Sequence, residues 1–131
     1  MLLAMQEGEL DTVFVNPVDY LDLDPYVNPK YRYTLSFGKK TEQCVKLVSS
    51  SLKPVSNLSQ LSGKRLSIPR GYLLGKLYLE VLLAEAGLSI PEDFFSNIHY
   101  TRNTNEALLD VFFNKADLAV TSDLAYELAL S

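Results

Sequence analysis

The stretch "LSGKRLSIPRGYLLGKLYLEVLLAEAGL", residues 61–88, decides the fold that we predict for this chain. "KRLSIP" (64–69) is typical of a strand, and the Pro-Arg-Gly sequence after it indicates a sharp turn. A helix then runs from 72 to 86 and ends at Gly87, the usual place for a glycine after a helix. We place one apolar side of this helix on Leu73, Leu77, Val81 and Ala84.

The same strand–helix alternation continues to the end of the chain. We predict strands at 97–101 and 117–120, and helices at 104–114 and 122–131. Asn103 is placed to cap the first of these helices, with Glu106 at capping-box spacing. The alternation predicts an α/β fold: an open, mostly parallel sheet with right-handed crossovers and flanking helices.

The segment before residue 61 is less regular. We expect the end of a helix at residues 1–7 and a short buried strand at 11–16. A helix follows in "NPVDYLDL", with Asn16 as its cap and Pro17 at its first position. Extended runs are expected at 31–37 and 42–50.

Composition narrows the class of function. The 131 residues are 47% hydrophobic and 21% charged, with a net charge of −4, as in one globular domain. The 12 Lys and Arg are dispersed, which argues against nucleic acid as a partner, since phosphate-backbone binding needs clustered positive charge. No apolar run is long enough for a membrane span, and we see no signal peptide.

Single cysteine and histidine residues leave little room for common catalytic chemistry. We expect Cys44 to be a buried structural thiol, and His99 a packing or surface residue. We expect no cofactor and no metal site. No nucleophile elbow, Walker loop or dinucleotide fingerprint is present, so an enzyme acting on a phosphorylated substrate is the weakest hypothesis.

A ligand site is expected where the parallel strands end. Helix N-termini gather at the carboxyl ends of such strands, and their N–H groups favour an anion. The junctions are "VFVN-PVDYL", "LSIP-RGYLL", "LAVT-SDLAY" and the less sharp "HYTRNTNEALL". They carry the candidate ligand-binding residues Tyr20, Arg70, Gly71, Tyr72, Thr104, Ser122 and Asp123.

Each candidate also has a structural interpretation. Arg70 can be a solvated side chain at a turn, and the tyrosines ordinary half-buried aromatics. Helix capping is the simpler account of Ser122 and Asp123, and Asp123 gains a ligand role only if the ligand carries a cation. Thr104 in a first helical turn is more often structural. Gly71 supplies backbone freedom with or without a ligand.

Several motifs resemble the periplasmic phosphate/phosphonate-type substrate-binding proteins of ABC transporters. They are "LSGKRL" (61–66), the Gly-Tyr helix entrance, "LLAEAGL", "DFF", "HYT", "NEALLDVFFNKADLAV" and the final "SD-x-x-YE". Upstream, "EGELDTVFVNPVDYL" looks like the family's first-lobe segment with a cleft tyrosine. The resemblance covers nearly the whole chain.

The resemblance implies a type II periplasmic-binding fold whose two α/β lobes close on a ligand. It assigns residues 1–45 to a partial first lobe with crossover strands and 46–131 to the second lobe. It implies a fragment that lacks the start of the first lobe and the C-terminal return. The family's cleft tyrosine falls on Tyr20, and its phosphonate-gripping turn on Pro69, Arg70, Gly71 and Tyr72.

Thr104 falls where the family often has His, and Asp123 on the acidic residue at the last strand end. The family's turn is typically rich in Ser and Thr, whereas this turn reads Pro-Arg-Gly-Tyr, so a different oxyanion or another small solute stays open. The resemblance implies a non-enzymatic, extracytoplasmic protein that captures a small anion for a membrane permease. The alternative is a sensing domain of the same fold in a sensor kinase or a transcriptional regulator.

Overall fold

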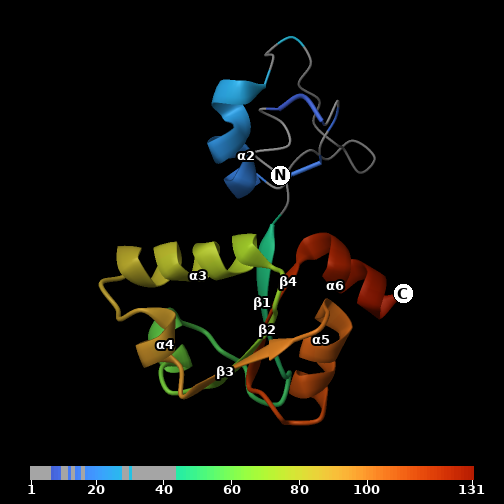
Figure 1. The fold of residues 1–131 in the computed structure, drawn as a ribbon. Helices are drawn as coiled ribbons and strands as arrows, with labels where there is room; N and C mark the ends of the chain where they lie inside the picture. Colours follow the sequence, from blue (N-terminus) through green and yellow to red (C-terminus); the bar gives the residue numbers. More distant parts are fainter. Residues whose placement is uncertain (1–6, 10–11, 13, 16, 28–29, 31–43) are drawn as a thin grey trace. The chain divides into compact units, whose positions relative to one another are not determined.

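The computed structural model describes residues 7–9, 12, 14–15, 17–27, 30 and 44–131. The chain divides into two compact units, residues 1–42 and 43–131, and each is described here by itself (Figure 1). None of the described helices is long and apolar enough to cross a bilayer.

The first unit contains helix α2 (Pro17–Leu23), followed by a single 3-10 turn, η1 (Asp24–Tyr26). Pro17 begins α2 as predicted, because the missing N–H of proline costs nothing at a first helical position. The buried strand expected at 11–16 is wrong at its described residues: Thr12, Phe14 and Val15 belong to no strand, and Phe14 is exposed. The Asn16 cap, residues 1–6 and the extended run at 31–37 lie outside the described residues.

The second unit is built on a four-stranded sheet in the order β1-β4-β2-β3. Its strands are β1 (Val45–Ser49), β2 (Arg65–Pro69), β3 (Asn97–Thr101) and β4 (Leu118–Ser122). β2 pairs in parallel with both β3 and β4, whereas the edge strand β1 is antiparallel to β4. The predicted α/β fold with a mostly parallel sheet is therefore confirmed.

Helices cover both faces of this sheet (Figure 1). They are α3 (Leu73–Glu85), α4 (Pro91–Phe94), α5 (Thr104–Phe112) and α6 (Asp123–Leu130). Side chains alternate along each strand: Leu66 and Ile68 of β2 join the core beneath α3, whereas Ser67 between them reaches α5. β4 repeats this pattern, since Val120 packs with α3 and Ala119 packs with α5.

The predicted apolar side of α3 is wrong. Gly75, Leu79 and Leu83 are the buried residues of this helix, whereas Leu73 and Val81 are about half exposed. The reason is that α3 is apolar almost all the way round, with leucine, valine or tyrosine on every side. Spacing alone therefore could not identify the side that faces the sheet.

Cys44 is exposed, so the prediction of a buried thiol is also wrong. It lies one residue before β1, and its backbone rather than its side chain contributes to structure. The Cys44 carbonyl accepts a hydrogen bond of 2.9 Å from the N–H of Asp123, and the Cys44 N–H donates to the Asp123 carboxylate at 3.3 Å. The strand entering the sheet is thus fastened to the start of α6.

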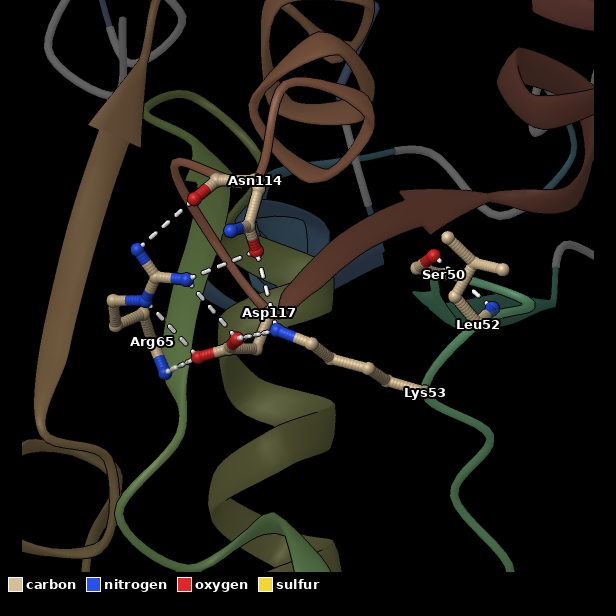
Figure 2. Close-up of polar contacts among 6 residues, drawn as sticks. All are labelled: Ser50, Leu52, Lys53, Arg65, Asn114 and Asp117. Carbon is tan, nitrogen blue, oxygen red and sulfur yellow. Dashed lines mark hydrogen bonds and ion pairs between the residues drawn. The ribbon is translucent and has the colours of Figure 1, made fainter.

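A polar cluster closes the amino edge of the sheet (Figure 2). Asp117 accepts hydrogen bonds from the Arg65 guanidinium through both oxygens, at 3.1 Å each, and from the Arg65 N–H at 3.0 Å. Lys53 donates to the side chain of Asn114, which lies just after the C-cap of α5 and has a φ of 58°. The hydrogen bonds from Arg65 outweigh the effect of burial and hold the pKa of Asp117 at about 2.

Candidate functional site

The carboxyl ends of the three parallel strands lie along one edge of the sheet. β2 ends at Pro69, β3 at Thr101 and β4 at Ser122, and α3, α5 and α6 begin just beyond them. The N–H of Arg70 donates to the Thr101 carbonyl at 2.9 Å and ties the first two ends together. The structure therefore brings the junctions after β2, β3 and β4 to a shared edge, which we call the carboxyl edge.

Side chains already cap two of the three helix N-termini at this edge. Asn103 caps α5 as predicted, because its side chain accepts from the Glu106 N–H at 2.9 Å. Glu106 in turn accepts from the N–H and the guanidinium of Arg102 rather than from Asn103. At α6 the Ser122 hydroxyl accepts from the Ala125 N–H at 3.1 Å, so Ser122 is a helix cap.

Asp123 is also engaged within the chain. Its carboxylate accepts from the Leu124 N–H at 2.9 Å and from the N–H of Cys44. These contacts hold the entering strand against α6 and give Asp123 a structural role. Within residues 44–131 no positive side chain forms an ion pair with Asp123.

The start of α3 differs from the other two. Its N-cap residue is Tyr72, which makes no side-chain capping bond. Arg70 is exposed, and its guanidinium makes no ion pair or hydrogen bond with the described residues. The Tyr72 hydroxyl is buried without a hydrogen-bond partner in the same part of the chain. The Arg70 guanidinium, the Tyr72 hydroxyl and the uncapped N-terminus of α3 are therefore close together in the sequence.

Burial first, and then the nearby charge of Asp123, raise the pKa of the Tyr72 hydroxyl. Tyr72 therefore stays neutral at ordinary pH and keeps its proton to donate. An added Cβ at Gly75 would lie 2.4 Å from the Tyr72 ring and 2.9 Å from Val120. Glycine at 75 is what allows the Tyr72 ring to lie against the first turn of α3.

The structure gives weaker support for a ligand role of Gly71 and Thr104. An added Cβ at Gly71 would meet no atom within 4 Å, so packing within the chain does not require glycine there. Thr104 is half buried at the first position of α5, and its side chain makes no hydrogen bond with the described residues. Sequence reasoning missed Thr101, a buried residue whose hydroxyl donates to the Asn103 carbonyl at 2.9 Å and shapes this loop.

A comparison with protein families gave one decisive result. The model of the family described as "ABC transporter, phosphonate, periplasmic substrate-binding protein" matches residues 1–131. The chain belongs to this family. The comparison with curated proteins gave no match. Substrate-binding proteins of this family are generally non-enzymatic and extracytoplasmic, and they serve a membrane transporter, which agrees with the expected class of function.

Tyr20, the cleft tyrosine that the family resemblance implies, lies in α2 of the first unit. Its hydroxyl donates to the carboxylate of Asp24, one turn further along the chain. A ligand role for Tyr20 stays a prediction.

A second polar cluster of this phosphonate-family protein lies under α5 and was not predicted. The buried carboxylate of Asp110 accepts from the Ser67 hydroxyl at 2.7 Å and lies 2.7 Å from Nδ1 of His99. Burial alone would raise the pKa of Asp110, but these hydrogen bonds and the charges of His99 and Lys115 outweigh it and lower the pKa. The signal in the sequence was an aspartate within the apolar run "ALLDVF".

The order of this cluster excludes a nucleophilic triad. The Ser67 hydroxyl donates to Asp110 and makes no hydrogen bond with His99, the base that would have to deprotonate it in a triad. Ser67 is also fully buried. His99 is a surface residue with a structural partner, as expected. Among the described residues no group of three potential metal ligands exists.

Proposed function

We propose that this protein captures a small oxyanion of the phosphonate class at the carboxyl edge and delivers it to a membrane permease. In this proposal residues 1–45 belong to the first lobe and 46–131 to the second. The observation that carries the proposal is the start of α3, where Arg70 and Tyr72 are without partners in the described chain. Family membership supports the ligand class.

The chemistry of this corner suits a phosphonate. The open N-terminus of α3 carries about half a positive charge, and anions are stabilised there. A guanidinium binds two oxygens of a phosphonate through parallel hydrogen bonds. The neutral Tyr72 hydroxyl supplies a further donor. An acidic protein of net charge −4 can therefore hold an anion without a basic surface.

Asp123 sets a condition on the ligand. A carboxylate near the Tyr72 hydroxyl repels a simple anion but attracts an ammonium group. We therefore expect 2-aminoethylphosphonate to bind more tightly than methylphosphonate. Gly71, Thr104, Ser122 and Tyr20 complete the proposed site: Gly71 through its backbone, Thr104 and Tyr20 through their hydroxyls, and Ser122 by holding α6 in place.

A thermal-shift series on the full chain tests the proposal. Phosphate, phosphite, sulfate, acetate, methylphosphonate and 2-aminoethylphosphonate are compared at equal ionic strength. We expect the phosphonates to raise the melting temperature, and Arg70→Ala to remove the effect. The matched control is Arg102→Ala, because Arg102 lies at the neighbouring junction but is already paired with Glu106 at 3.2 Å. Equal stabilisation of both variants would contradict the proposed site.

A further inference from the structure

An exposed apolar patch lies at the amino edge of the sheet, opposite the proposed ligand site. We call it the Phe112 patch; its members are Leu52, Leu109, Phe112 and Phe113. Leu52 is 90% exposed, Phe112 79% and Phe113 61%. Leu52 and Phe112 line the same hollow of about 250 Å³, and the rings of Phe112 and Phe113 meet edge to face at 5.1 Å. Leu109 lies one helical turn before Phe113.

Cationic side chains surround this patch. Arg65 and Lys53 both reach Asn114, the residue after Phe113, at 3.1 Å and 3.3 Å (Figure 2). Lys115 follows and is exposed. The carboxylate of Asp117 lies among these cations, but it is largely buried and already holds Arg65. The other nearby carboxylate, that of Asp110, is buried against Ser67 and His99.

The exposed apolar residues of α3 lie in a different electrostatic setting. The exposed apolar residues of α3, such as Leu73 and Val81, lie on a helix whose Lys76 is paired with Glu92 at 3.5 Å. At the Phe112 patch Lys53 and Arg65 both pair with the carboxylate of Asp117, at 3.9 Å and 3.1 Å. Lys115 is exposed beside them, so positive charge exceeds negative charge here on a chain whose net charge is −4. Positive charge around protruding leucine and phenylalanine side chains is the pattern of proteins that lie on an anionic membrane surface.

We propose that the Phe112 patch binds the anionic surface of a lipid bilayer. The Phe and Leu tips enter the headgroup region, where aromatic rings are well accommodated. Lys53 and Lys115 contact lipid phosphates, whereas Arg65 keeps its hydrogen bonds to Asp117 and Asn114. Because the patch and the carboxyl edge lie at opposite ends of the strands, membrane binding leaves the proposed ligand site open to solvent.

Co-sedimentation of the full chain with lipid vesicles tests this proposal. Vesicles of phosphatidylcholine alone are compared with an equal mixture of phosphatidylcholine and phosphatidylglycerol, at low and raised salt. We expect binding to the mixed vesicles, weakened by salt, and little binding to phosphatidylcholine. Phe112→Ser with Phe113→Ser should lower the partition coefficient at least tenfold, and Lys115→Glu about fivefold or more. Leu73→Ser with Val81→Ser is the matched control and should leave the partition coefficient unchanged.

The outcomes separate this proposal from others. No binding of the native chain to the mixed vesicles, or an equal loss in the α3 control, overturns it. Lys115→Glu exposes no core surface, so the test stands even if the double phenylalanine variant fails to fold. A dimer in sedimentation velocity that the phenylalanine variant abolishes, without vesicle binding, would assign the patch to self-association instead. No phosphonate is present in these assays, so their result is independent of the proposed function.

Discussion

Asp117 joins separate segments of the second unit. Its carboxylate holds the start of β2 through Arg65 and lies 3.9 Å from Lys53 of the connecting loop. Asp117→Ala should lower the free energy of unfolding by about 1–3 kcal/mol, because the charged donors of Arg65 lose their acceptor. Urea denaturation measures this. Glu92→Gln, which breaks the exposed pair with Lys76, is the control and should lower the free energy of unfolding by less than Asp117→Ala does.

The Asp117 carboxylate should also make the stability of the fold depend on pH in acid. The pKa of Asp117 in the folded protein is about 2, below its ordinary value of 3.8. A lowered folded-state pKa means that the stabilisation is complete above about pH 4 and is lost as the pH falls towards 2. Unfolding free energies measured across this window should show the loss in the native chain and a flatter profile in Asp117→Asn. Parallel profiles would contradict the assignment.

The Asp110 cluster beneath α5 can be tested by substitution in the same way. Asp110→Ala leaves the fully buried Ser67 hydroxyl without its acceptor and should destabilise the fold by about 1–3 kcal/mol. His99→Gln should cost less, because more than half of the imidazole is exposed. Denaturation of the two variants side by side checks the order; a larger loss in His99→Gln would show that the histidine, not the serine, anchors the cluster.

At the scale of the element, the first turn of α3 depends on Gly75. Alanine is the better helix former by about 1 kcal/mol, yet a Cβ here would clash with Tyr72 and Val120. Gly75→Ala should therefore destabilise the fold and displace the Tyr72 ring. Thermal melting measures the first effect and phosphonate titration the second. A stabilised variant with unchanged binding would show that the Tyr72 ring does not need this position.

Element types were predictable because their signals are local. The turn after β2, the Asn103 cap and the Ser122 cap all appear in the sequence at the positions where the structure has them. The buried side of α3 was not predictable, since a helix that is apolar all round has no preferred side until the sheet is in place. Cys44 was misjudged because alternation does not show where an edge strand begins.

In the molecule as a whole, topology predicts the position of the proposed site but not its chemistry. Parallel strands bring Arg70, Thr104 and Ser122 to one edge whatever their side chains do. Only the contacts show which helix N-terminus lacks a cap. The side chains of Asn103 and Ser122 cap α5 and α6, whereas the Tyr72 side chain makes no capping bond at α3. The Asp110 and Asp117 clusters join residues 43 and 52 positions apart, and no local pattern reports such pairs.

The chain enters the second unit at the carboxyl edge, since β1 is antiparallel to β4 and the Cys44 N–H is hydrogen-bonded to Asp123. A bound ligand, the entering strand and the start of α6 would then be neighbours. We therefore expect Asp123→Ala to change phosphonate binding and stability together, whereas Arg70→Ala changes binding alone. Titration calorimetry and urea denaturation on both variants separate the two roles.

Backbone NMR of the full chain during titration with methylphosphonate and 2-aminoethylphosphonate can locate the proposed site residue by residue. We expect the largest amide shifts at residues 70–75, with smaller shifts at 101–104 and 122–125. Arg70→Ala should abolish them. Shifts confined to the amino edge around Lys53 and Asn114, or no saturable shift with either phosphonate, would show that the carboxyl edge is not the phosphonate site.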